Sequence, residues 1–112
     1  MAFVRVCALS AVPPGRMLRI ESGAEPVALC NVGGVFHAVD DTCTHSNWSL
    51  CDGDLEGDVL LCPLHNARFC VRTGRVLAPP APDPLRVYPV RIDGDDVLVD
   101  LQAGAVHPDV TA

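Results

Sequence analysis

Two short segments of the chain each pair a cysteine with a histidine. Cys43 and His45 form a C-x-H pair, and Cys62 and His65 form a C-x-x-H pair after a spacer of 16 residues. Each pair is short enough to present both side chains from one tight loop, and thiolates and imidazoles are common ligands of transition metals. The spacing therefore predicts a metal site that two loops build together.

The order of the four ligands narrows the choice of metal. Common zinc fingers place two cysteines on one element and two histidines on another, whereas each segment here supplies one of each. A mixed pair on each loop suits a two-iron cluster in which both cysteines bind one iron and both histidines bind the other, as in Rieske [2Fe-2S] centres. A structural zinc module with the same four ligands is the alternative, and iron and sulfide analysis would separate the two.

The chain resembles the small Rieske ferredoxins of bacterial aromatic-ring-hydroxylating dioxygenase systems, such as those for biphenyl, toluene or carbazole. The likeness extends from Phe3 to about Gly104. Besides the ligand segments, it is carried by Asp40-Asp41-Thr42, Trp48-Ser49-Leu50, Leu55-Glu56-Gly57, Phe69-Cys70-Val71-Arg72-Thr73-Gly74 and Pro79-Pro80. The resemblance implies one [2Fe-2S] cluster, with its buried iron on Cys43 and Cys62, its outer iron on His45 and His65, and a proline-containing loop covering it.

The same resemblance implies an electron carrier without a reaction of its own. In that family the protein passes single electrons from a flavin-dependent NADH ferredoxin reductase to a terminal ring-hydroxylating oxygenase, so these two are the expected partners. A small Rieske subunit of a nitrite reductase-like enzyme is the alternative. An oxygenase would need a further site of two histidines and a carboxylate, and only His37 and His107 remain, on a strand and in the tail.

The ligand set also bears on the reduction potential. Two neutral imidazoles in place of two thiolates make the cluster less negative, so it takes up an electron more readily than an all-cysteine cluster. Rieske proteins of respiratory complexes have hydroxyl donors two and four residues after the second histidine, where this chain has Ala67 and Phe69. Without those donors, we expect a potential at the low end of the class range of roughly −150 to +300 mV.

Composition sets further bounds. With 112 residues, of which 49% are hydrophobic, the chain is expected to form one globular domain. Eight arginines, no lysine and 14 acidic residues give a net charge of −6, which disfavours nucleic acid as a partner. The acidic residues around the ligands form either a docking surface for a basic partner or a solvated face. They are Asp40, Asp41, Asp52, Asp54, Glu56 and Asp58.

The start of the chain lacks the basic and apolar regions of a signal peptide, and no segment approaches the length of a membrane span. We therefore expect a cytoplasmic protein with reduced thiols and no membrane association. Cys7, Cys30 and Cys70 are expected to be buried, whereas Cys51, in a polar turn, is the candidate for an exposed and oxidisable thiol. Trp48 is expected to pack over the cluster, with a partner-facing anchor as the alternative.

The elements that must position the two loops are predicted to be strands, since no segment has a convincing helical period. Strands are expected at 3–7, 17–20, 26–32, 35–39, 59–61, 67–71, 76–77, 85–92 and 97–101. The fold class is therefore all-β, and the resemblance implies the Rieske iron-sulfur fold, an antiparallel β-sandwich or barrel base with an inserted cluster-binding subdomain. We expect a single Rieske domain over residues 1–112, with the cluster-binding subdomain at about 40–82, the basal β subdomain at 1–39 and 83–104, and a C-terminal tail at 105–112.

Overall fold

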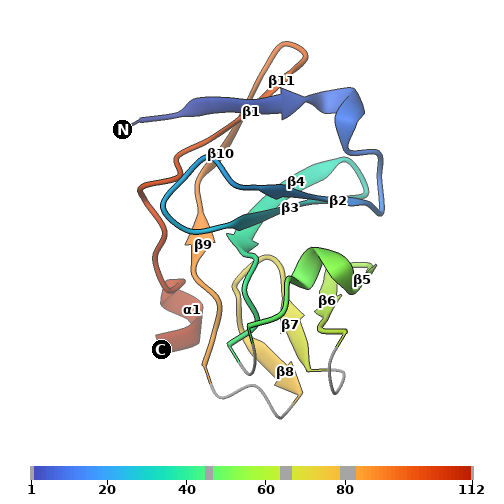
Figure 1. Cartoon of the computed structure of the whole chain (residues 1–112), viewed down its shortest axis with the longest axis vertical. Helices are drawn as coiled ribbons and strands as arrows, with labels where there is room; N and C mark the ends of the chain where they lie inside the picture. The colour runs from blue at the N-terminus through green and yellow to red at the C-terminus, as the bar shows by residue number, and fades with distance from the viewer. Residues whose placement is uncertain (1, 45–46, 64–66, 79–82, 112) are drawn as a thin grey trace.

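Three antiparallel sheets make up the computed structural model of the protein, which describes residues 2–44, 47–63, 67–78 and 83–111. Two of the sheets form a base, and the third lies at the opposite end of the molecule with the two predicted ligand loops (Figure 1). This arrangement confirms the predicted all-β class with an antiparallel base.

The base is built from two sheets that combine early and late parts of the chain. The first has the order β1-β11-β10, with β1 (Val4–Ala8), β11 (Asp96–Val99) and β10 (Val90–Asp93). The second has the order β2-β3-β4-β9, with β2 (Met17–Ile20), β3 (Val27–Val32), β4 (Val35–Asp40) and β9 (Val87–Tyr88). Because β9 pairs with β4, the chain returns to the base beside the strand by which it left.

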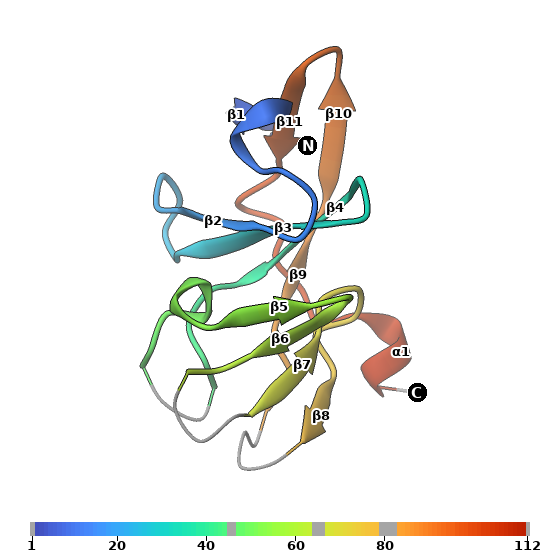
Figure 2. The same cartoon turned by 90° about the vertical axis from the view of Figure 1, so that its right-hand side faces the viewer.

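Strand β3 is buried on both faces, because its sheet is the middle layer of the molecule (Figure 2). Val27 and Leu29 belong to a core shared with Val97 of the first sheet. Ala28 and Cys30, at the alternate positions, belong to a second core, which also includes both predicted ligand cysteines. This two-sided burial explains why the strand lacks alternation of apolar and polar residues.

The third sheet is a meander in the order β5-β6-β7-β8. Its strands are β5 (Asp54–Glu56), β6 (Val59–Leu61), β7 (Arg68–Cys70) and β8 (Val76–Ala78). Leu60 and Phe69 lie opposite each other on β6 and β7, and both are fully buried in the second core. The second core therefore joins the third sheet to the middle layer at the level of the ligand cysteines.

Two parts of the strand prediction are wrong. The segment 85–92 forms two strands in different sheets, since β9 pairs with β4 and β10 pairs with β11. Pro89 lies between them, and without an N–H it cannot continue a hydrogen-bonded ladder. Residues 54–56, which lie outside the predicted strands, form β5 and pair with β6.

The C-terminal segment folds back onto the third sheet. Ala105 forms an isolated antiparallel bridge with Val87, and the short helix α1 spans Pro108–Thr111. The Arg75 guanidinium, from the connection between β7 and β8, donates a hydrogen bond to the Asp109 carbonyl at 2.8 Å. No helix in the described ranges is long and apolar enough to cross a membrane.

Candidate metal centre

The two predicted ligand segments are loops that close in the same way. In loop one (43–48), the backbone N–H of Cys43 donates to the Trp48 carbonyl at 3.0 Å. In loop two (62–67), the N–H of Cys62 donates to the Ala67 carbonyl at 2.8 Å. Each cysteine therefore lies where the two ends of its loop are hydrogen-bonded to each other. His45 and His65 belong to these loops by sequence and lie outside the described residues.

Both ligand cysteines are buried in the second core. Cys43 is 2% exposed and Cys62 is 0% exposed, and they share that core with Cys30, Leu60 and Phe69. Two buried thiols on two similar loops fit the cysteine-bound iron of a Rieske cluster, which takes one thiolate from each loop. The histidine half of the ligand set remains a prediction.

Gly53 sets the spacing between the two loops. It follows η2 (Leu50–Asp52), the 3-10 turn after loop one, and a Cβ atom on it would overlap the carbonyl oxygen of Leu61, directly before Cys62. Its φ angle of −92° is open to any residue, so the glycine is required for space rather than for backbone freedom. The turn after loop one thus packs on the backbone that leads into loop two.

Asp41 anchors loop one from inside the protein. Its carboxylate accepts hydrogen bonds from the Ser49 hydroxyl at 2.5 Å and from the Cys51 N–H at 3.0 Å. It also forms an ion pair with Arg19 of β2 at 3.2 Å, and the Asp41 side chain is 1% exposed. A buried carboxylate is costly unless it is paired and hydrogen-bonded, and this one has partners from both the base and the end of loop one.

Asp40 connects the strand that leaves the base with the strand that returns. Its two carboxylate oxygens accept hydrogen bonds from the Arg86 guanidinium at 3.1 Å, and the Tyr88 hydroxyl donates to it at 2.7 Å. Burial and the hydrogen bond to Asp40 raise the pKa of Tyr88. The hydroxyl therefore keeps its proton and remains a donor at physiological pH.

The chain that follows the third sheet is held against loop one. The Thr44 hydroxyl, between the two predicted ligands of that loop, donates to the Asp83 carbonyl at 2.7 Å. The Leu85 N–H donates to the Gly74 carbonyl at 2.9 Å, and a side chain at Gly74 would overlap Leu85. The prolines expected to cover the cluster fall within residues 79–84, of which 79–82 lie outside the described residues.

Trp48 and Cys51 were singled out by the sequence. Trp48 is 51% exposed, which favours the alternative of a partner-facing residue, and its packing over the cluster stays a prediction. Cys51 is half-buried against the second core, and burial together with a hydrogen bond to Asp41 raises its pKa. The expected exposure of Cys51 is therefore wrong, and the raised pKa disfavours the reactive thiolate.

The acidic residues around the ligands divide into two groups. Three form ion pairs: Asp40 with Arg86, Asp41 with Arg19, and Asp58 with Arg72. Three others are exposed: Asp52, Asp54 and Glu56. Asp40 and Asp41 are shielded and tie segments of the fold together, whereas the side chains of Asp58 and of the other three residues are open to a partner or to solvent.

The two histidines outside the ligand loops have other contacts. His37 on β4 is half-buried, and burial lowers its pKa, with a smaller effect in the same direction from Arg72. Nδ1 of His107 accepts a hydrogen bond from the Asp109 N–H at 3.1 Å, at the start of α1.

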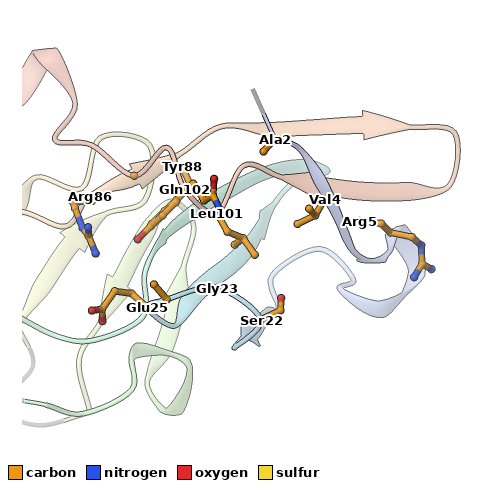
Figure 3. Close-up of a pocket in the computed structure, with 12 residues that line it drawn as sticks. Ala2, Val4, Arg5, Ser22, Gly23, Glu25, Arg86, Tyr88, Leu101 and Gln102 are labelled. Carbon is orange, nitrogen blue, oxygen red and sulfur yellow. The ribbon is translucent and has the colours of Figure 1, made fainter.

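A cavity of about 670 Å³ lies in the base, and Cys43 and Cys62 do not line it. Figure 3 shows Arg86, Tyr88 and Glu25 at one end of this cavity and Val4 and Arg5 at the other. Arg86 and Tyr88 are the side chains that bind Asp40. The cavity therefore borders the junction between the base and the third sheet, and the two loops remain the candidate centre.

Comparison with known proteins identifies the family. A family model for the Rieske [2Fe-2S] domain matches residues 2–89, and the chain belongs to that family. The ferredoxin component of biphenyl 2,3-dioxygenase from Rhodococcus jostii (strain RHA1) is 54% identical over 104 residues, which cover 93% of this chain and 97% of that protein. These findings confirm the predicted resemblance to dioxygenase ferredoxins.

Solved structures agree with this assignment. A chain in the complex of reduced oxygenase and oxidized ferredoxin in carbazole 1,9a-dioxygenase is 42% identical, with a TM-score of 0.82 over 87% of this chain and 91% of that chain. The ferredoxin of carbazole 1,9a-dioxygenase from Nocardioides aromaticivorans IC177 is 33% identical, with a TM-score of 0.83 over 88% and 97%. The predicted Rieske fold, the Rieske-type [2Fe-2S] cofactor and the predicted role as an electron-transfer component rather than an enzyme are thereby confirmed.

Proposed function

We propose that this protein carries single electrons from a flavin-dependent NADH ferredoxin reductase to a terminal aromatic-ring oxygenase, with Cys43, His45, Cys62 and His65 as cluster ligands. The observation that supports it most is the 54% identity to a dioxygenase ferredoxin component, which spans nearly the whole of both chains. A chain of similar fold occurs in a solved complex of a ferredoxin with its oxygenase. That complex supports the oxygenase as partner.

Two of the four proposed ligands, Cys43 and Cys62, are among the described residues. A bound [2Fe-2S] cluster provides a one-electron redox couple. Cys43 and Cys62 hold it from the protein side, where Leu60 and Phe69 exclude water. Ala67 and Phe69 are fully buried and have no hydroxyl to donate to a sulfur atom, which supports a potential at the low end of the Rieske range.

Low-temperature EPR of the dithionite-reduced protein, with iron and sulfide measured on the same sample, tests the ligand set. A rhombic signal is expected whose average g lies below the free-electron value and below that of a plant-type ferredoxin, at about two irons per chain. His45→Ala and Cys62→Ala should each abolish that signal. A colourless, zinc-containing sample from an anaerobic preparation would instead support the structural zinc module.

Reconstituted turnover tests the partners. Mixing the protein with NADH, a ferredoxin reductase and a ring-hydroxylating oxygenase should give hydroxylated product only when all components are present. Electron delivery to a nitrite reductase but not to the oxygenase would favour the nitrite reductase-like alternative.

We propose a cytoplasmic location. Among the described residues, Cys7, Cys30, Cys51 and Cys70 have no disulfide, as expected in a reducing compartment. Recovery of the protein in a periplasmic or membrane fraction of its host would contradict this location.

A further inference from the structure

A buried ion pair lies directly before loop one. Asp41 precedes Cys43 by two residues, so their Cα atoms are within about 7 Å of each other. The side chain of Asp41 is 1% exposed, whereas that of Arg19, its partner, is 43% exposed. The carboxylate is therefore a fixed negative charge in the protein interior, close along the chain to a predicted cluster ligand.

The contacts of Asp41 join the base to both ends of loop one. Its N–H donates to the Pro26 carbonyl at 3.0 Å, which fixes Asp41 to the base. Its carboxylate accepts hydrogen bonds from Ser49 and Cys51, and its backbone carbonyl accepts one from the Leu50 N–H. The segment that follows loop one is therefore hydrogen-bonded to Asp41, which precedes the loop.

The pair also balances charge near the centre. A carboxylate opposes the addition of an electron to a nearby cluster and a guanidinium favours it, and these effects are stronger in the interior than in water. Within the part of the chain that the structure describes, Arg19 forms one further ion pair, with Glu21 at 3.6 Å, and the Glu21 side chain is 70% exposed. Removal of either member of the Asp41–Arg19 pair would therefore leave the charge of the other uncompensated.

We propose that Asp41 is the positioning residue of loop one, and that Asp41 and Arg19 shift the reduction potential of the cluster in opposite directions, so that each charge offsets the other. The inference rests on the proposed ligand set. Asp41 holds the loop in place through Ser49 and Cys51, and Arg19 offsets the negative charge that this anchor introduces.

The test measures reduction potential and iron retention in the full, cluster-loaded chain. Asp41→Asn keeps the size of the side chain and an acceptor oxygen, and it should raise the potential and speed the loss of iron to a chelator several-fold. Arg19→Gln should lower the potential. The double variant should return towards the potential of the wild type, because both charges are then absent.

A matched control removes the acid of another ion pair. Asp96 binds Arg5 at 2.8 Å in the first base sheet, so Asp96→Asn should leave the potential and the iron loss unchanged. Wild-type potentials in both fully loaded single variants would overturn the charge balance, and wild-type iron retention in Asp41→Asn would overturn the positioning role. If Asp41→Asn does not load iron, the positioning role is supported and Arg19→Gln alone decides the charge effect. A wild-type protein without a Rieske signal would overturn the ligand set itself, which is a different result.

Discussion

Asp40 and Arg86 lock together the two strands that connect the base to the third sheet. Asp40 is the last residue of β4 and Arg86 directly precedes β9, which pairs with β4. The guanidinium contacts both carboxylate oxygens at 3.1 Å, and the Asp40 N–H donates to the Arg86 carbonyl at 3.0 Å. This short, cross-linked ladder is therefore one of the attachments of the third sheet and the ligand loops to the base, beside the contacts of Asp41 and the second core.

Asp40→Ala should destabilise the protein by about 1–3 kcal/mol, because it leaves the hydroxyl of Tyr88, a residue that is 7% exposed, without its acceptor. Arg86 is 44% exposed, so solvent screens most of its contribution. Denaturant unfolding followed by circular dichroism measures the change. Tyr88→Phe removes only the hydroxyl and should cost about 1 kcal/mol. Wild-type stability in Asp40→Ala would contradict the locking role.

The ligand loops could be predicted from the sequence because their chemistry is local. Four ligands within short spacings specify a metal site without knowledge of the rest of the chain. The roles of the acidic residues could not be predicted in this way. Asp41 and Asp52 look alike in the sequence, but Asp41 is buried because Arg19, 22 residues earlier, reaches it, whereas Asp52 is exposed.

The same contrast applies to the strands. Apolar runs such as Val27–Val32 predict strands because they are buried on both faces. The strand Asp54–Glu56 has acidic residues at both ends and forms because β6 pairs with it, which is a tertiary effect that overrides local preference. Trp48 likewise has no local signal that separates an exposed from a packed side chain.

Gly53→Ala should push η2 and loop two apart. The new methyl group would overlap the Leu61 carbonyl oxygen and lie close to Pro63, and overpacking of this kind costs about 1–3 kcal/mol. We expect lower stability and a smaller cluster content per chain, measured from iron analysis and the visible absorbance. Gly57→Asn is the control, since Gly57 has a φ of +62°, which asparagine tolerates, and open space around it. Equal cluster content in Gly53→Ala and Gly57→Asn would contradict the spacing role.

Thr44→Val should loosen the attachment of the chain after the third sheet. It removes the hydroxyl that donates to the Asp83 carbonyl while keeping the shape of the side chain. We expect the cluster to bleach faster in the presence of a chelator, because water reaches loop one more readily. Thr44→Ser retains the hydroxyl and should bleach at nearly the wild-type rate. Identical bleaching of Thr44→Val and the wild type would show that the hydrogen bond does not protect the centre.

His37 should make stability depend on pH. Burial lowers its pKa in the folded protein, so below the ordinary value of about 6.5 the unfolded chain takes up a proton that the folded chain resists. Stability should fall as the pH decreases through that value and level off below the folded-state pKa. The difference in Tm between the wild type and His37→Gln, followed from pH 8 to pH 5, isolates this contribution. A difference that is independent of pH would contradict it.

Trp48→Ala should weaken partner binding without changing the centre. An exposed tryptophan in a ligand loop is the type of residue that anchors an interface, and truncation of such residues often costs more than about 1 kcal/mol of binding free energy. In reconstituted turnover we expect the KM for this protein to rise several-fold, with the reduction potential and EPR signal unchanged. Val35→Ala is the control, because Val35 is 58% exposed at the start of β4, in the base. An equal KM for both variants would mean that Trp48 does not contact the oxygenase.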